Sequence, residues 1–228
     1  TTEIYTLSLH DALPICYLEI DASAETLLLE DDKDLAFTRK VNERYGSSDF
    51  LVLTYSPHAD LLADATLDSL RKLSAELLEL ERVESVMSIL NVPLLESPPK
   101  PIKELIKNVP TLESPGIDKA LAKLEFLNSP IYRDNLVSPD FKTTALLINL
   151  FDDPLYRELL KQRNVLRKKE KDGSLSVLEQ SELKNVLINF KNHRDKMRLV
   201  EHENISLVRE IAEKYRGDAK IFLGGASM

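Results

Sequence analysis

An acidic run near the start of the chain is the first group of residues that could do chemistry. Four carboxylates lie within five positions, at Glu30, Asp31, Asp32 and Asp34. Carboxylate oxygens are ligands that suit Ca²⁺ or Mg²⁺. The run lacks the spacing and the glycine of a calcium-binding loop, so we interpret it as a solvated acidic connector.

A basic cluster lies in the second half of the chain. Its five members are Arg163, Arg167, Lys168, Lys169 and Lys171. They fall at the tip of a predicted helical hairpin, where they could meet anionic lipid headgroups or a partner. A plain solvated tip is the interpretation that we favour.

Three histidines are candidate metal ligands or general bases. His58 follows Pro57 in a predicted turn, whereas His193 and His202 lie on one predicted helix. Zinc ligands on a helix usually occur four residues apart, and a separation of nine residues places two side chains on nearly opposite faces. We therefore expect surface histidines and no metal ligand.

No recognised nucleophile or phosphate-binding motif occurs in the sequence. No GxSxG is present, and Gly224-Gly225 lacks the lysine and the following helix of a phosphate loop. We expect these two glycines to form a flexible exit from the domain. The sequence predicts no catalytic residue, no cofactor and no metal site, and we expect that the protein is not an enzyme.

Composition favours a folded domain with a water-facing surface. The chain has 228 residues with a net charge of -8, and 43% of its residues are hydrophobic and 30% charged. No apolar run approaches the roughly 18 to 20 residues that span a bilayer. The acidity argues against nucleic acid as a partner, and a single cysteine excludes an internal disulfide.

The first fifteen residues are treated separately from the rest. Residues 1–15 (TTEIYTLSLHDALPI) resemble the translation of a widely used short-read sequencing adapter. We exclude them from the fold as an adapter-derived artefact, together with His10 and Asp11, and the identity of Cys16 is in doubt for the same reason. The remaining 213 residues carry 30 basic and 36 acidic side chains, a net charge of -6.

Hydrophobic periodicity predicts four strands and several helices. Strands are expected at 50–55, 83–90, 142–151 and 219–223, and a helix is expected from Asp64 or Thr66 to residue 81. Six prolines between residues 93 and 115 mark 93–135 as an insertion with short helices at 102–109 and 117–127. Residues 155–216 read as a helical hairpin broken at 171–173, with a capping box at Ser176 and Glu179.

The predicted helices carry apolar stripes. These stripes are Leu67, Leu70, Leu77 and Leu78 on the first helix, Leu183, Val186, Leu187 and Phe190 on the returning arm, and Met197, Val200, Val208, Ile211 and Tyr215 farther along. We interpret them as core-forming. The alternative is that they line a substrate path, but an apolar path would more naturally lie between this domain and a partner.

The order of the elements defines the fold class. With the insertions set aside, it reads strand, helix, strand, strand, helix, strand, which is the split βαβ order of ferredoxin-like folds. We therefore predict an α+β fold with a four-stranded antiparallel sheet, both helices on one face. Two helical insertions, at about 93–135 and 154–196, are added to it.

Two separated segments resemble a known family. Residues 21–57 (DASAETLLLEDDKDLAFTRKVNERYGSSDFLVLTYSP) combine an acidic connector, a short amphipathic helix and a buried strand, and residues 221–228 (IFLGGASM) close the domain. Their order resembles the first extracytoplasmic loop of exporters of the resistance-nodulation-division (RND) superfamily, in the MMPL-like branch that exports lipids and other hydrophobic molecules.

This resemblance implies a domain organisation and a function. Residues 16–48 would be a connector and short helix after a missing membrane span, and 49–228 a porter domain on the extracytoplasmic (periplasmic) side of the inner or cell membrane. It would handle hydrophobic or lipid-like substrates during proton-driven efflux. The residues that relay the protons would lie in the missing membrane helices. Its partners would be those helices and a second porter loop; the oligomeric state is open.

A function of another class remains open. The chain could be a soluble α+β interaction module whose helical hairpin, within 155–216, docks a protein. The flanking gene sequence separates the two, because an exporter requires roughly 20 apolar residues close to the domain on both sides.

Overall fold

The computed structural model describes residues 34, 37, 40, 41, 49–97, 99 and 109–225. The chain forms two compact units, Thr1–Ser47 and Ser48–Met228. In the first unit the four described residues are helical, with Phe37 69% exposed and Val41 partly buried. Tyr45, the other members of the acidic run and residues 1–15 lie outside the described residues.

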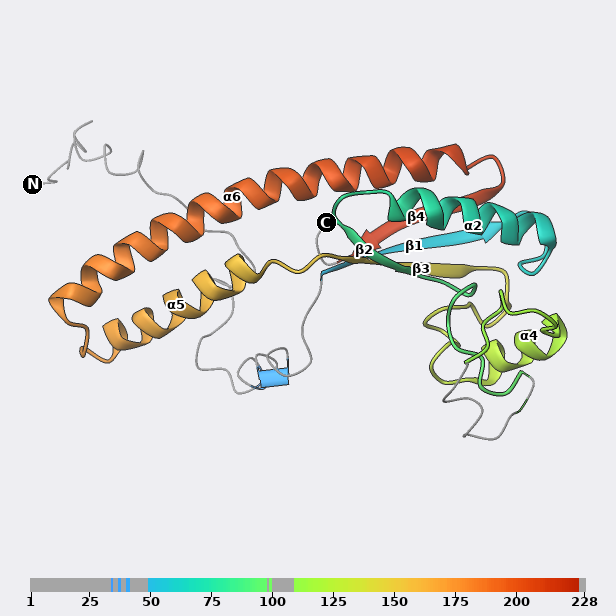
Figure 1. Cartoon of the computed structure of the whole chain (residues 1–228), viewed down its shortest axis with the longest axis horizontal. Coiled ribbons are helices and arrows are strands. Elements are labelled where there is room, and N and C mark those ends of the chain that lie inside the picture. The colour runs from blue at the N-terminus through green and yellow to red at the C-terminus, as the bar shows by residue number, and fades with distance from the viewer. Residues whose placement is uncertain are drawn as a thin grey trace, which may run out of the picture. The chain divides into compact units, whose positions relative to one another are not determined.

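The second unit is built on a four-stranded antiparallel sheet. Its strands are β1 (Phe50–Pro57), β2 (Val83–Met87), β3 (Thr144–Leu150) and β4 (Ala219–Gly225). They lie in the order β2-β3-β1-β4 (Figure 1). This is the sheet order of the split βαβ arrangement, and the predicted α+β fold with an antiparallel sheet is confirmed.

The register brings three parts of the chain to one end of the sheet. Leu51 at the start of β1 pairs with Gly225 at the end of β4, and Phe50 pairs with Asn149 near the end of β3. The chain therefore enters and leaves the sheet at the same end. The prediction of a flexible exit at Gly224 and Gly225 was wrong, because both residues belong to β4.

One face of the sheet carries the core. Helices α2 (Asp64–Leu78) and α6 (Val177–Lys214) pack on this face, and α6 does so with its C-terminal part (Figure 1). Alternate strand side chains point toward the helices, as at Leu51, Leu53 and Tyr55, which are fully buried. The helices contribute Leu67, Leu70, Leu73, Leu77, Ile205, Val208 and Ile211 to the same cluster.

Two details of the predicted core were wrong. Leu78 is 48% exposed, and Leu73 takes its place in the buried stripe of α2. In β2 a register shift lies between Val83 and Ser85, so that Val83 and Val86 both face the core. A bulge of this kind adds a residue to one strand and breaks strict alternation, which is why the strand expected at 83–90 does not bury every second residue.

The insertion between β2 and β3 forms a lobe around helix α4 (Lys119–Asn128). Phe126 is fully buried there and meets Tyr132 edge-on, with ring centroids 5.5 Å apart. The buried carboxylate of Glu125 accepts hydrogen bonds from the backbone N–H groups of Leu95 at 2.6 Å and Glu96 at 3.0 Å. Residues 102–108, in the other predicted helix, lie outside the described residues.

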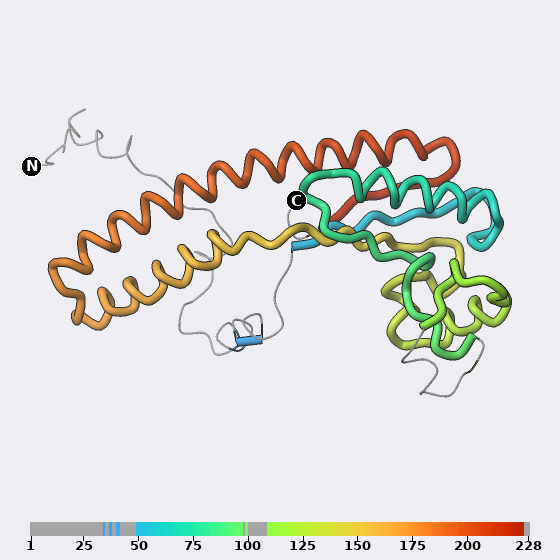
Figure 2. Tube along the Cα trace, viewed as in Figure 1, coloured from blue at the N-terminus to red at the C-terminus, as the bar shows by residue number. Residues whose placement is uncertain are grey.

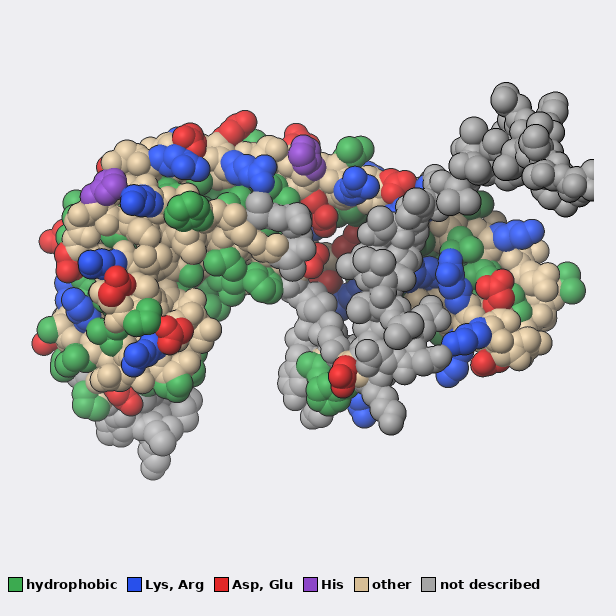
Figure 3. All heavy atoms as spheres, turned by 180° about the vertical axis from the view of Figure 1, so that it is seen from behind, with side chains coloured by type: hydrophobic (Ala, Val, Ile, Leu, Met, Phe, Trp, Pro, Cys, Tyr) green, Lys and Arg blue, Asp and Glu red, His purple; other side chains and the backbone are tan. Residues whose placement is uncertain are grey.

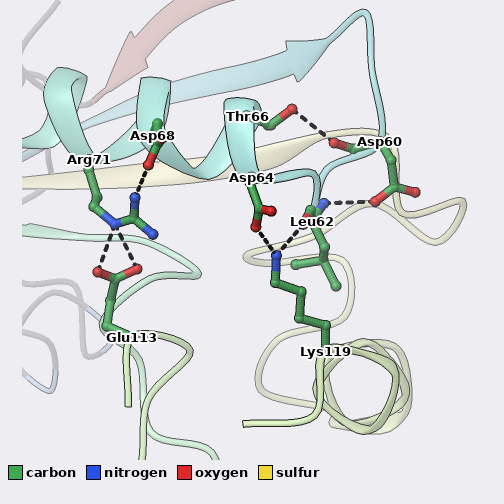
Figure 4. Close-up of polar contacts among 8 residues, drawn as sticks. All are labelled: Asp60, Leu62, Asp64, Thr66, Asp68, Arg71, Glu113 and Lys119. Carbon is green, nitrogen blue, oxygen red and sulfur yellow. Dashed lines mark hydrogen bonds and ion pairs between the residues drawn. The ribbon is translucent and has the colours of Figure 1, made fainter. Parts of the chain in front are cut away.

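Polar contacts join this lobe to α2 (Figure 4). Lys119 Nζ lies 2.9 Å from the carbonyl oxygen of Leu62 and 2.5 Å from Asp64 Oδ1. Arg71 Nε lies 2.8 Å from Glu113 Oε2, and the same guanidinium also contacts Asp68. These side chains are exposed, so solvent screens the ion pairs and their contribution to stability is small.

The insertion after β3 is an antiparallel helical hairpin, seen along the trace in Figure 2. Helix α5 (Pro154–Lys171) runs away from the sheet, and the N-terminal part of α6 returns beside it. Leu166, Leu183 and Val186 form a second small hydrophobic cluster between the arms. The predicted capping box is confirmed, because the Ser176 side chain and the Glu179 carboxylate each bond the other residue's backbone N–H.

Candidate functional site

A group of polar side chains lies where the hairpin leaves the sheet; we call it the junction. The junction consists of Asp49, Arg82, Asp153, His193 and Glu201, and Asn204 follows Glu201 by three residues on the same helix. Four elements position them, because Asp49 precedes β1, Arg82 precedes β2, Asp153 caps α5, and the last three belong to α6. Backbone bonds hold the segments together, from Leu150 N to Asp49 O at 2.9 Å and from Phe151 N to Arg82 O at 3.0 Å.

Asp153 and His193 form the central contact of the junction. His193 Nε2 lies 2.6 Å from Asp153 Oδ2, and the two side chains are 17% and 21% exposed. Asp153 also caps α5 by accepting a hydrogen bond from Tyr156 N at 2.9 Å. Burial alone would raise the pKa of Asp153, but the bonds with Tyr156 and His193 together lower it below its ordinary value. The contact therefore favours a charged Asp153 and joins the two arms of the hairpin.

Glu201 is the second titratable group of α6 in the junction. Burial raises the pKa of its carboxyl group, and the nearby charges of Asp49 and Asp153 raise it further, while Arg82 opposes them. Glu201 is therefore influenced by the charges of two carboxylates and one guanidinium. When the three carboxylates are ionised, the group carries an excess of negative charge, which a proton on Glu201 would reduce.

Two buried hydrogen-bond donors, on Asn204 and Arg82, have no acceptor among the residues that the structure describes. Asn204 is 5% exposed and its Nδ2 has no partner, and Nε of Arg82 is likewise buried without one. An unsatisfied buried donor costs about 1 to 3 kcal/mol. These two donors are under-bonded, whereas the other side chains of the junction are partly or fully exposed.

The chemistry open to the junction is proton binding. Within the part of the chain that the structure describes, no three His, Cys, Asp or Glu side chains are arranged to hold a metal ion. Seen from behind, acidic and basic side chains lie together between the sheet and the hairpin (Figure 3). The raised pKa of the Glu201 carboxyl, beside two further carboxylates, means that this group binds a proton more readily than an ordinary glutamate.

The histidine predictions are partly corrected. His193 was expected on the surface, but its side chain is mostly buried because it pairs with Asp153. His58 and His202 are exposed, as predicted.

The basic cluster is also partly corrected. Arg163 does not lie at the tip: it is 9% exposed and stacks on Phe190, with its guanidinium carbon 4.4 Å from the ring centroid. Lys169 pairs with Glu179 across the hairpin at 2.5 Å. Arg167, Lys168 and Lys171 are exposed near the tip, where Lys and Arg side chains are interspersed with Asp and Glu over the visible face of the hairpin (Figure 3).

A signal for the junction is present in the sequence, in the apolar stripe of the last helix. Met197 and Val200 were assigned to the inner side of that helix, and both are partly buried. His193 lies four residues before Met197, and Asn204 four residues after Val200, so the same helical face carries them. A histidine on a stripe assigned to the core predicts a buried polar contact, although it does not name the partner.

The face of the sheet opposite the helices exposes apolar side chains. Phe50, Met87 and Phe222 are 40%, 44% and 69% exposed, and Val52 and Leu147 pair between them. A shallow pocket of about 170 Å³ adjoins the edge of this face and is lined by residues that include Ser85, Met87 and Asn91. This volume is below the roughly 300 to 1,000 Å³ of typical small-molecule sites.

Comparison with known proteins identifies no relative: no family model matches the chain, and no curated protein matches it. Among the described residues, no helix combines the length and the apolar character needed to cross a membrane.

Proposed function

We propose that this chain is the extracytoplasmic, substrate-handling domain of a proton-driven membrane exporter of hydrophobic or lipid-like molecules. The observation that carries the proposal is the pairing of Leu51 with Gly225. A domain inserted between two membrane spans must begin and end at neighbouring points, and this pairing provides such a geometry. The resemblance of residues 21–57 and 221–228 to the RND superfamily favours an exporter over other membrane proteins that carry an inserted domain.

The exposed sheet face gives this proposal a place for a partner. Phe222, at 69% exposure, and Met87, at 44%, lie on a face that the described helices leave uncovered. In the proposed exporter a second porter loop covers this face, and the hydrophobic substrate passes near the contact between the two domains, since ligand sites favour domain interfaces. This domain itself supplies no catalytic residue.

The decisive experiment determines the gene sequence on both sides of the segment that codes for residues 16–228. Apolar stretches of roughly 20 residues close to both sides are expected. Polar flanks on both sides would overturn the proposal. Efflux of a fluorescent lipid from vesicles that contain the complete protein, with and without a proton gradient, then tests the activity. The domain alone should give no flux, and a proton-coupled flux from it would contradict the proposed division of labour.

A second function is favoured by a different observation. The hairpin exposes large apolar side chains at Val177, Leu178 and Leu199, which are 79%, 84% and 73% exposed. Exposed apolar side chains on a projecting element are typical of protein-binding surfaces. A soluble module that docks a protein through the hairpin is therefore the alternative, and polar flanks in the gene would favour it.

A further inference from the structure

The two edges of the sheet differ in how they are protected. At one edge, β2 has 5 residues, a register shift between Val83 and Ser85, and the exposed carboxylate of Glu84. Short strands, bulges and charges are devices that protect sheet edges from pairing with another chain. At the other edge, β4 pairs with β1 over all of its 7 residues without a bulge, and its single charge is Lys220 near its start. The edge formed by β4 is therefore the less protected one.

The register of β4 determines which of its backbone groups point away from β1. His58 N donates a hydrogen bond to the carbonyl oxygen of Asp218 at 3.1 Å, one step beyond the pairing of the two strands. Hydrogen-bonded pairs and non-hydrogen-bonded pairs alternate along an antiparallel ladder. Phe222 therefore directs its N–H and C=O toward β1, whereas Ile221 and Leu223 direct theirs outward. Among the described residues, no backbone hydrogen bond satisfies these outward groups.

The side chains of β4 favour an apolar strand as the neighbour at this edge. Phe222 lies on the open face of the sheet and is 69% exposed. On the helix side, Ile221 is buried in the main core and Leu223 packs against it while only partly buried. Aromatic and β-branched side chains on neighbouring strands stabilise each other. An added strand with apolar residues would cover both Phe222 and Leu223.

The charges beside this edge favour an acidic partner. Helix α2 lies toward β2 and α6 toward β4 (Figure 1), and Lys214 of α6 bonds Glu76 of α2 at 2.6 Å. Val208 faces the core, and at about 100° per residue Arg209 and Lys214 fall on opposite flanks of α6. The exposed side chain of Arg209 therefore lies on the flank above the outer edge of β4, and the exposed Lys220 lies on the other face of the same edge.

We propose that the outer edge of β4 binds an extended segment of a partner protein, which pairs with Ile221 and Leu223 as a fifth strand and carries apolar residues flanked by acidic ones. In strand addition the main-chain hydrogen bonds provide the affinity and the side chains provide the specificity. Arg209 and Lys220 give this edge its preference for acidic segments. A second copy of the chain fits less well, because its own β4 edge carries the same two positive charges.

The inference is independent of the exporter proposal. An exporter domain and a soluble module could each use the edge of β4, since the argument rests on the strand register and on charge. The sequence of the flanking gene, which tests the exporter, does not bear on strand addition. Failure of either proposal therefore leaves the other standing.

The test titrates a synthetic peptide, acetyl-Glu-Glu-Val-Thr-Val-Thr-Val-Glu-Glu-amide, into the full chain labelled with nitrogen-15. We expect saturable binding, with amide exchange at Ile221 and Leu223 slowed by about tenfold or more. Exchange at Phe222 should not change, because its N–H already bonds β1. The absence of binding, or binding that leaves Ile221 and Leu223 unprotected, would overturn the proposal. Sedimentation that shows a dimer with these amides protected before the peptide is added would overturn it too, because a second copy would then occupy the edge.

A proline variant tests the role of the backbone edge. Leu223→Pro removes an N–H that points away from β1, and proline is tolerated on edge strands in that position. This variant should lose peptide binding, whereas Leu223→Val, which keeps the N–H, should bind like the parent. Circular dichroism establishes that both variants are folded. A folded Leu223→Pro chain that binds like the parent would overturn the proposal.

A charge variant provides a check that does not require Leu223→Pro to fold. Arg209→Glu should weaken binding of the acidic peptide by about fivefold. It should strengthen binding of the same peptide with lysine in place of glutamate. Lys184→Glu makes the same change of charge at an exposed position of the hairpin and should alter the affinity by less than about twofold. Equal weakening by the two variants would contradict the position assigned to the partner strand.

Discussion

Among the described glycines, Gly225 is the one at which an added Cβ would make the closest contact. Its φ is 154°, and a Cβ at this position would lie 2.7 Å from the carbonyl oxygen of Phe50. Real Cβ atoms do not approach backbone oxygen so closely, and β1 cannot retreat without breaking its pairing with β4. The glycine is therefore required by the strand pairing that joins the two ends of the domain.

We predict that Gly225→Ala lowers the free energy of unfolding by about 1 to 3 kcal/mol, from backbone strain and the close contact. Urea denaturation followed by circular dichroism measures the loss. Gly217→Ala is the matched control, because a Cβ added there would meet no atom within 4 Å and the φ of Gly217 is not positive. It should change stability by less than about 0.5 kcal/mol. Equal effects at the two glycines would contradict the account of Gly225.

The buried polar residues mark the limit of what the sequence predicted. Apolar spacing identified Leu67, Leu70 and Leu77 as core residues. It could not reveal that Asp49, Arg82 and Glu201 meet, because that depends on how the strands register and on where α6 crosses the sheet. Asp153 caps α5, and its position directly before Pro154 is a signal for a helix start that the sequence does contain.

At the scale of the elements, adjacent leucines of α2 test which face is buried. Leu77 is fully buried and Leu78 is 48% exposed. We predict that Leu77→Ala costs about 2 to 5 kcal/mol of stability, since it leaves a cavity in the main core. Leu78→Ala, the same change one residue on, should cost less than about 1 kcal/mol. Thermal unfolding of the two variants measures both losses of stability. A larger loss in Leu78→Ala than in Leu77→Ala would mean that the buried face of α2 is assigned wrongly.

The turn of the hairpin carries its own titratable group. Glu179 bonds Lys169 at 2.5 Å and the backbone N–H of Ser176 at 2.9 Å. These contacts, with that of Lys169 the largest, lower the pKa of Glu179 from 4.5 to about 2. A lowered pKa means that the carboxylate stabilises the folded hairpin above its ordinary pKa and that this contribution is lost as pH falls toward about 2.

We predict that Lys169→Met returns the pKa of Glu179 part of the way toward 4.5. Carbon-13 NMR of the side-chain carboxyl, followed from about pH 6 to about pH 2, measures the change. Lys168→Met is the control, since it removes an exposed charge from the neighbouring position and should leave the titration of Glu179 unaltered. A shift of equal size in both variants would mean that general charge, and not the Lys169 contact, sets the pKa.

The order of the elements predicted the topology of the sheet better than it predicted the ends and irregularities of single strands. A chain that reads strand, helix, strand, strand, helix, strand has few right-handed solutions, and the observed order β2-β3-β1-β4 is one of them. The bulge near Glu84 and the extension of β4 to Gly225 were missed, because each depends on the neighbouring strand and leaves no periodic trace in the sequence.

The pairing of β1 with β4 leads to a prediction for the molecule as a whole. Neighbouring antiparallel strands lie about 4.7 to 4.9 Å apart, so a short Gly/Ser linker can join residue 225 to residue 49 without strain. We predict that residues 49–225, closed in this way, unfold at a higher temperature than the linear form of the same residues. Closure removes entropy from the unfolded chain, by up to about 5 kcal/mol in the chain-entropy model. Scanning calorimetry of the closed and linear forms measures the difference. A closed form that is less stable than the linear one would show that the ends do not meet as Leu51 and Gly225 place them, and it would remove the main structural support for a domain inserted between two membrane spans.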